Sequence, residues 1–157
     1  MNVIETNNLV KTYHQGELEV HALNDVSIHF KQGEFTAIVG PSGSGKTTFL
    51  NAIGGLDTPT TGTVMINETD ITQLKSNQLI DFRLKNIGFV FQAYNLIPVL
   101  TAKENVEFIM LMQGASSNER GARAKELLEA VGLSEQINRR PGQLSGGQQQ
   151  RVAVARA

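Results

Sequence analysis

A run of glycines and serines closed by one lysine, in the first third of the chain, has the pattern of a phosphate-binding loop. It consists of Gly40, Pro41, Ser42, Gly43, Ser44, Gly45, Lys46, Thr47 and Thr48. The run fits the spacing G-x-x-x-x-G-K-[ST] at every fixed position. In such a loop the glycines let backbone N–H groups point at phosphate oxygens, the lysine adds positive charge, and the threonine hydroxyl ligates Mg²⁺. The run therefore predicts a site for a nucleoside triphosphate, with Lys46 and Thr47 as its charged and metal-binding groups.

A second short motif lies near the end of the sequence. Leu144, Ser145, Gly146, Gly147 and Gln148 place a hydroxyl and two glycines directly before a helix-forming run. The first N–H groups of a helix are free to bind an anion, and the helix dipole favours negative charge there. A flexible linker is the alternative reading of such a sequence, but a linker would not lead into helix-forming residues. The motif predicts a second anion-accepting helix N-terminus.

The elements that must hold the first loop are a strand before it and a helix after it. Residues 34–40 form a short apolar and β-branched run that ends in glycine, which is typical of a buried strand. Residues 47–54 suit a helix, with Phe49, Leu50 and Ile53 on one face. The order strand, glycine-rich loop, helix is the context that phosphate binding by this loop requires.

The remaining secondary-structure signals divide the chain into a β-rich and a helical part. Residues 3–13 and 20–30 mix β-branched with polar side chains, and we expect them to pair as antiparallel strands across a turn at residues 14–17. The other predicted elements are strands at residues 63–67 and 87–92 and helices at residues 76–85, 101–113, 118–131 and 146–157. The pattern predicts an α/β fold whose second half is helical.

Together, the two motifs resemble those of ATP-binding-cassette (ABC) ATPases. Residues 144–148 read L-S-G-G-Q, the signature of that family, and they follow the phosphate loop in the family's order, with Gln92 between the two. The resemblance spans the chain. It implies a P-loop NTPase core with an N-terminal antiparallel β subdomain over residues 1–92, and a helical signature subdomain over residues 93–157.

The resemblance also implies roles for individual residues. Tyr13 stands where the family stacks an aromatic ring on adenine, so ATP would contact Tyr13 and the loop residues named above. Gln92 matches the glutamine that senses the γ-phosphate and Mg²⁺. Lys46 and Gln92 would be the catalytic residues, and Thr47 and Gln92 the Mg²⁺ ligands. The alternatives are an ordinary strand-end tyrosine at position 13 and a polar strand cap at position 92.

Partners and cellular place follow from the same resemblance. The signature residues would contact the nucleotide of a second ATPase subunit in a head-to-tail dimer, and transmembrane permease subunits would complete the transporter. Shorter strings at residues 19–23, 54–57, 88–92 and 100–106 resemble the ATPases of lipoprotein release and macrolide export. The resemblance thus implies Mg-ATP as ligand and a peripheral position on the cytoplasmic face of the cell membrane.

Composition excludes several other classes. A chain of 157 residues with a 40% hydrophobic share is expected to form a single soluble domain. A net charge of −1 gives no positive field for nucleic acid, and the lack of cysteine excludes disulfides and thiolate chemistry. We expect no nucleic-acid partner, no signal peptide and no transmembrane helix.

One part of the family pattern is not in the sequence. A P-loop ATPase needs an aspartate on Mg²⁺ at the end of a buried strand, and ABC members place a glutamate beside it. None of the four aspartates, Asp25, Asp57, Asp70 and Asp81, follows a run of four apolar residues. In the family that strand comes after the signature helix, so we expect the C-terminal core strands to be missing and the chain alone to be inactive.

Two rival functions depend on features that the sequence lacks. A P-loop GTPase would carry the guanine-reading motif Asn-Lys-x-Asp, which does not occur. A non-transport ABC module of the DNA-repair or chromosome-maintenance type remains the alternative. Such modules insert a long coiled coil or a zinc site before the signature, and neither heptads nor cysteines are present here. The ABC transporter ATPase is therefore the leading interpretation.

Overall fold

The computed structural model describes residues 1–157, apart from the side chain of Gln15, and it divides into two units. The first unit is residues 1–83 and the second is residues 84–157. The strands are β1 (Asn2–Gln15), β2 (Leu18–Lys31), β3 (Thr61–Ile66) and β4 (Thr69–Asp70). The α-helices are α1 (Lys46–Ile53), α2 (Ser76–Asn86), α3 (Ala102–Met112), α4 (Ser117–Ala130) and α5 (Gly146–Arg156). Short 3₁₀ turns cover Ile71–Gln73, Ser134–Gln136 and Pro141–Gln143.

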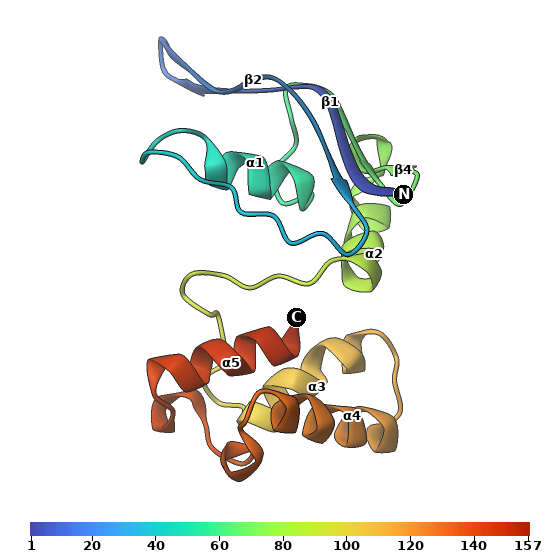
Figure 1. Ribbon diagram of the computed structural model, residues 1–157, viewed down its shortest axis with the longest axis vertical. Coiled ribbons are helices and arrows are strands. Elements are labelled where there is room, and N and C mark those ends of the chain that lie inside the picture. Colours follow the sequence, from blue (N-terminus) through green and yellow to red (C-terminus); the bar gives the residue numbers. More distant parts are fainter. The chain divides into compact units, whose positions relative to one another are not determined.

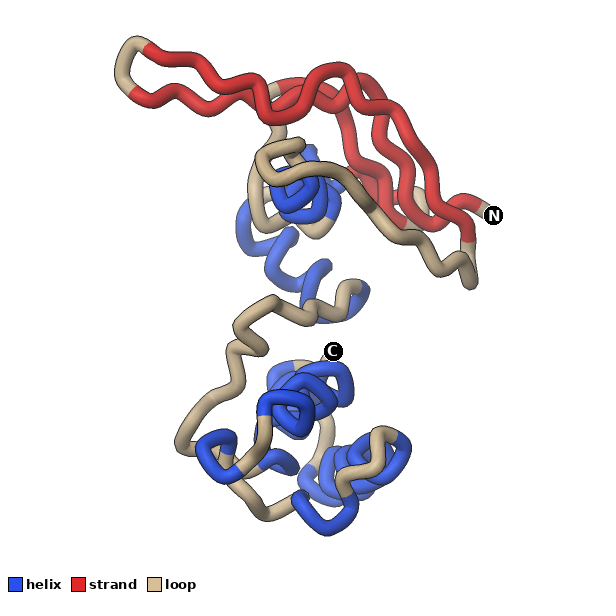
Figure 2. Tube along the Cα trace, turned by 60° about the vertical axis from the view of Figure 1, so that its left-hand side comes forward, coloured by secondary structure: helices blue, strands red, loops and turns tan.

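The first unit is built on one antiparallel sheet with the strand order β2-β1-β3-β4. Strand β1 pairs with β2 along its whole length, from Asn2 opposite Lys31 to Gln15 opposite Leu18, and its other edge pairs with β3. Figure 2 shows that the free end of the β1–β2 hairpin extends beyond the other strands. The pairing confirms the antiparallel strands predicted at residues 3–13 and 20–30, and the strand predicted at residues 63–67.

Helix α1 packs against the sheet through β1 and β2 (Figure 1). Its buried residues are Phe49 and Ala52, and the Phe49 ring lies 6.3 Å from the ring of Phe30 on β2. Leu9 of β1 and Leu23 of β2 are also buried. Complete burial of a side chain the size of phenylalanine contributes about 1.5–3 kcal/mol. This packing fixes the start of α1, where the glycine-rich loop ends.

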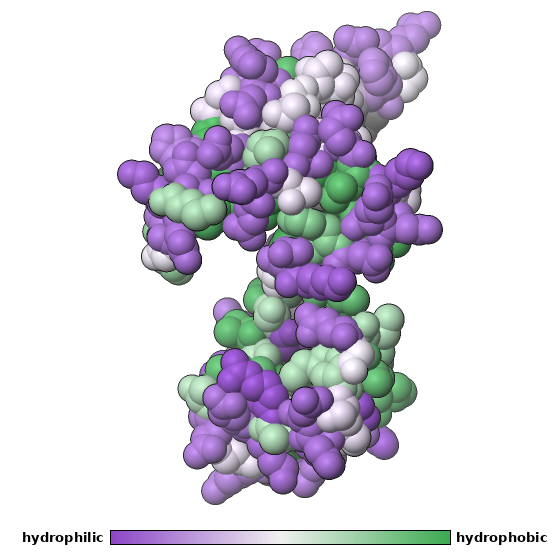
Figure 3. Space-filling model, turned by 90° about the vertical axis from the view of Figure 1, so that its right-hand side faces the viewer, coloured by the Kyte–Doolittle hydropathy of each residue, from purple (hydrophilic) through white to green (hydrophobic). Residues whose placement is uncertain are grey.

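Two predicted strands are wrong, because residues 34–40 and 87–92 form no strand in the structure. Phe35 is 99% exposed and Val39 is 86% exposed, so the first of these segments is not buried. A buried parallel strand needs hydrogen-bonded neighbours on its edges. Within the described chain the four strands pair only with one another, and neither segment gains such a neighbour. Apolar side chains are accordingly visible among polar ones on the surface of both units (Figure 3).

The boundary between the two units lies earlier in the chain than the sequence predicts. It falls after Arg83, whereas the expected boundary is after Gln92. Residues 87–92, which have no place in the sheet, are grouped with the helices. No helix in the described residues has the length and the apolar character that crossing a membrane demands.

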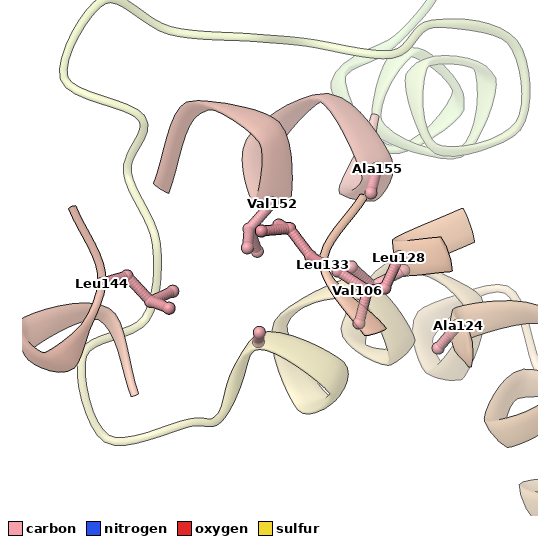
Figure 4. Close-up of a cluster of buried hydrophobic side chains, with 8 residues drawn as sticks. Val106, Ala124, Leu128, Leu133, Leu144, Val152 and Ala155 are labelled. Carbon is pink, nitrogen blue, oxygen red and sulfur yellow. The ribbon is translucent and has the colours of Figure 1, made fainter. Parts of the chain in front are cut away.

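The second unit is a small helical domain around one apolar core. Val106 of α3, Leu128 of α4 and Val152 of α5 are buried and converge with Leu133, as Figure 4 shows. Leu144, immediately before α5, belongs to the same cluster. The predicted helices at residues 76–85, 101–113, 118–131 and 146–157 are confirmed to within a few residues.

Candidate functional site

The predicted phosphate loop, residues 40–45, enters α1 through glycines with a left-handed backbone. Gly43 and Gly45 have φ angles of +80° and +84°, a region that residues with a side chain rarely adopt. Gly45 is the N-cap of α1 and packs against β2, where an added Cβ would lie 2.3 Å from the carbonyl oxygen of Ala22. Glycine at position 45 is therefore required by both conformation and space, and it lets the loop turn directly into the helix.

Lys46 lies across this loop. Its ammonium donates hydrogen bonds to the carbonyl oxygens of Gly40 at 2.9 Å and Pro41 at 2.7 Å, and it is 3.4 Å from Oγ of Ser44. These acceptors are neutral, so the ammonium would form stronger hydrogen bonds with the anionic oxygens of a phosphate group. The lysine is thus held where a phosphate in the loop would meet it.

Thr47 supplies the only protein oxygen that sequence analysis assigns to Mg²⁺ in the first unit. The residue is exposed in the first turn of α1, next to Lys46. Among the residues that the structure describes, no three His, Cys, Asp or Glu side chains are grouped to hold a metal ion. A hydroxyl and phosphate oxygens are ligands that suit Mg²⁺, so the loop fits an ion that arrives as Mg-ATP.

Tyr13, the predicted adenine contact, is anchored by two charged neighbours. Its hydroxyl donates to Oδ2 of Asp57 at 2.6 Å, and the Lys11 ammonium lies 4.9 Å from the centre of its ring. The hydrogen bond to Asp57 and partial burial raise the pKa of Tyr13, against the smaller lowering effects of Thr48 and Lys11. Tyr13 stays 36% exposed. The contact with Thr48 places this ring beside the first turn of α1.

Asp57 is ionised more readily than an ordinary aspartate. Burial raises the pKa of Asp57, but the hydrogen bonds from Lys11 and Tyr13 outweigh that effect and bring the pKa below its usual value. The Lys11 ammonium lies 2.5 Å from Oδ1 of Asp57 and donates to the Thr58 carbonyl as well. The phenol, the carboxylate and the ammonium thus form one connected group.

The signature motif forms the N-terminus of α5. Ser145 is the N-cap, with its hydroxyl accepting from the N–H of Gln148 while Gln148 Oε1 accepts from the N–H of Ser145. Leu144 anchors the turn in the core of the second unit. A Cβ added to Gly146 or Gly147 would meet no described atom within 4 Å. The two glycines therefore leave the first turn of α5 open to an approaching group.

Gln92 lies in a turn rather than at the end of a strand. The turn is closed by the N–H of Tyr94, which donates to the Phe91 carbonyl at 2.9 Å. Arg156, at the end of α5, donates to the carbonyl oxygens of Asn95 at 2.6 Å and Tyr94 at 2.8 Å. The structure brings Tyr13, the phosphate loop and Thr47 together in the first unit, and places Gln92 and residues 144–148 in the second.

Comparison with known proteins decides the family. The sequence profile described as "ABC transporter" matches residues 23–157. The chain belongs to the ABC transporter family. A curated "Uncharacterized ABC transporter ATP-binding protein" from Thermotoga maritima is 52% identical over 155 residues, covering 99% of this chain and 66% of that protein. The "Macrolide export ATP-binding/permease protein MacB" of Mannheimia succiniciproducens is 48% identical over 157 residues, which are 100% of this chain and 24% of that protein.

Solved structures of an ABC cassette confirm the fold class. The dimeric ATP-binding cassette MJ0796 bound to ADP and Pi has a TM-score of 0.91 and 48% identity, over 98% of this chain and 68% of that chain. MJ0796 comes from Methanocaldococcus jannaschii. The antiparallel sheet with its helices is thus the N-terminal portion of an ABC-type α/β P-loop ATPase. The chain spans less than two thirds of the length of the Thermotoga relative.

Two residues that sequence analysis left without a role gain one from the geometry. In the sequence, Asp57 belongs to a string typical of an ABC subgroup and does not follow an apolar run, and Arg156 lies within the predicted helix at residues 146–157. The residues around Asp57 in the sequence do not indicate that it binds Tyr13. The residues around Arg156 likewise do not indicate that it binds the loop at Tyr94. Pairing such positions needs the tertiary contacts.

Proposed function

We propose that this chain is the ATP-binding part of an ABC transporter subunit that hydrolyses ATP to drive a transmembrane permease. The observation that carries the proposal is the glycine cradle with Lys46 at the start of α1, in a chain of the ABC family that also has the signature at the start of α5. The permease component of the MacB relatives supports a membrane partner and an export, lipoprotein-release or mechanical role. The subunit would work on the cytoplasmic face of the membrane.

Each part of the site has a role in this proposal. Lys46 exchanges its carbonyl partners for the β- and γ-phosphates, and backbone N–H groups of the loop hold the remaining oxygens. Thr47 ligates the Mg²⁺ that accompanies the nucleotide. Tyr13 stacks on the base, and stacking on an aromatic ring contributes about 1–3 kcal/mol. These contacts all lie within residues 1–92, the proposed nucleotide-binding core.

The helical part, residues 93–157, would serve assembly. Ser145, Gly147 and Gln148 contact the γ-phosphate of a nucleotide on a second copy, which gives a head-to-tail dimer. The dimeric MJ0796 structures support this arrangement. Gln92, the last residue of the proposed core, would report on the γ-phosphate and Mg²⁺ from its turn before α3.

A phosphate-release assay tests the proposed activity and the requirement for further residues. We call the extended domain the 157 residues joined to the C-terminal part of the Thermotoga maritima relative that they do not cover. The extended domain should hydrolyse ATP, and the 157 residues alone should not exceed background, since no aspartate follows an apolar strand to hold Mg²⁺. Lys46→Ala in the extended domain is the control. Hydrolysis of ATP by the 157 residues alone at about one per second would contradict the proposal.

A further inference from the structure

Asp57 holds the ring of Tyr13 through its hydroxyl and through Lys11. One carboxylate oxygen accepts from the phenol and the other from the ammonium, at 2.6 and 2.5 Å. The side chains of Lys11 and Asp57 are only 13% and 28% exposed, so their attraction is screened less than that of a surface pair. The same ammonium lies 4.9 Å from the ring centre of Tyr13. The ring is therefore held at its hydroxyl and covered by a cation, while more than a third of the residue remains exposed.

Asp57 is in turn fixed to the helix that begins at the phosphate loop. The N–H groups of Leu56 and Asp57 donate to the carbonyl of Asn51 in α1, at 2.8 and 3.2 Å. The segment that follows is tied to β1, because the N–H of Thr60 donates to the Val10 carbonyl at 2.8 Å. Helix α1 thus carries Lys46 at one end and the anchor of Tyr13 at the other. The position of the ring relative to the loop is set by a rigid element rather than by the tyrosine side chain itself.

We propose that Asp57, supported by Lys11, is a positioning residue that presets the Tyr13 ring for the base of the nucleotide. The inference rests on the proposed function. A ring that is already oriented loses less side-chain freedom when a base stacks on it, so binding is tighter than with a mobile ring. Stacking accepts any base, so the contribution should be similar for ATP and GTP and absent for tripolyphosphate, which has no base.

The test compares the affinities of the 157-residue protein for ATP and for tripolyphosphate by calorimetric titration. Asp57→Ala and Tyr13→Phe should each weaken ATP binding by about three- to tenfold and leave tripolyphosphate binding unchanged. The double variant should bind ATP at most about twofold more weakly than either single variant, because both substitutions remove the same hydrogen bond. Asp57→Asn, which keeps an acceptor oxygen, should restore most of the ATP affinity.

A matched control separates this effect from a general loss of structure. Asp25→Ala removes a carboxylate of β2 that accepts a hydrogen bond from the side-chain amide of Asn8, and it should change neither affinity. Equal weakening of ATP and tripolyphosphate by Asp57→Ala would overturn the inference, since the carboxylate would then act on the whole fold. An undiminished effect of Asp57→Ala in the Tyr13→Phe background would overturn it as well.

A spectroscopic measurement tests the link without any ligand. Tyr13 and Tyr94 are the two tyrosines of the chain, so Tyr94→Phe leaves one phenol whose ionisation is followed by ultraviolet absorbance. Asp57→Asn in that background should lower the pKa of Tyr13, because the bond to the carboxylate raises it. An unchanged pKa would overturn the inference. Failure of the wild-type protein to bind either ligand, with Lys46→Ala no different, would instead refute the proposed function.

Discussion

Gly43 and Gly45 show two separate reasons for glycine in the phosphate loop. Both have φ near +80°, where an L side chain costs about 1–2 kcal/mol. A Cβ at Gly43 would meet no atom of the described residues within 4 Å, whereas a Cβ at Gly45 would lie 2.3 Å from the Ala22 carbonyl oxygen. The two positions therefore share a left-handed backbone and differ in the room available for a side chain.

The pair gives a matched prediction. Gly45→Ala should lower the free energy of unfolding by more than about 2 kcal/mol and weaken ATP binding, because the backbone of the loop or of β2 must move. Gly43→Ala should cost only about 1–2 kcal/mol and keep the path of α1. Urea unfolding and ATP titration measure both effects. Equal losses for the two variants would show that contact with Ala22 is unimportant.

At the scale of elements, three helices of the second unit begin in the same way. Thr101, Ser116 and Ser145 are N-caps of α3, α4 and α5, and each takes part in a capping box. In α3 and α4 the reciprocal partner is a glutamate, Glu104 or Glu119, while in α5 it is a glutamine. These caps satisfy N–H groups that the helices leave unpaired.

The glutamate caps predict a pH dependence of stability. The bond from the Thr101 N–H lowers the pKa of Glu104, and the bond from the Ser116 hydroxyl lowers that of Glu119. A carboxyl whose folded pKa is depressed stabilises the fold above its ordinary pKa of about 4.5, and this is lost as pH falls through the folded value. The urea concentration at the midpoint of unfolding should therefore fall on acidification below about pH 4.5. Joint replacement Glu104→Gln and Glu119→Gln should flatten that dependence, and an identical slope would refute the assignment.

The first turn of α5 allows binding to be separated from assembly. Ser145→Arg should leave ATP affinity of the extended domain as a monomer nearly unchanged while blocking ATP-dependent dimerisation and turnover, because the motif would serve the partner's nucleotide. Ser116→Ala, which removes the equivalent cap of α4, is the control and should still dimerise. Size-exclusion chromatography with ATP reports the outcome. Dimerisation and hydrolysis by Ser145→Arg would refute a composite site.

At the scale of the whole molecule, local patterns predicted the chain well where neighbours in sequence decide the structure. The helix predicted at residues 101–113, the β1–β2 hairpin and the turn into α1 all depend on residues close together in the sequence. The predictions of strands at residues 34–40 and 87–92 are wrong, because a buried strand depends on hydrogen-bonded partners elsewhere in the sheet. For the same reason, the resemblance to ABC ATPases implied a role for Tyr13, but nothing in the sequence pointed to Asp57, its partner across the fold.

The central claim is that residues 40–47 bind the phosphates of Mg-ATP through Lys46. Titration of a fluorescent ATP analogue into the 157-residue protein tests it most directly, beside Lys46→Ala and the exposed-lysine control Lys75→Ala. Circular dichroism would establish that all three are folded. Lys46→Ala should weaken binding at least about tenfold, equivalent to about 1.4 kcal/mol, and Lys75→Ala should not change it. An unchanged dissociation constant for Lys46→Ala would contradict the account.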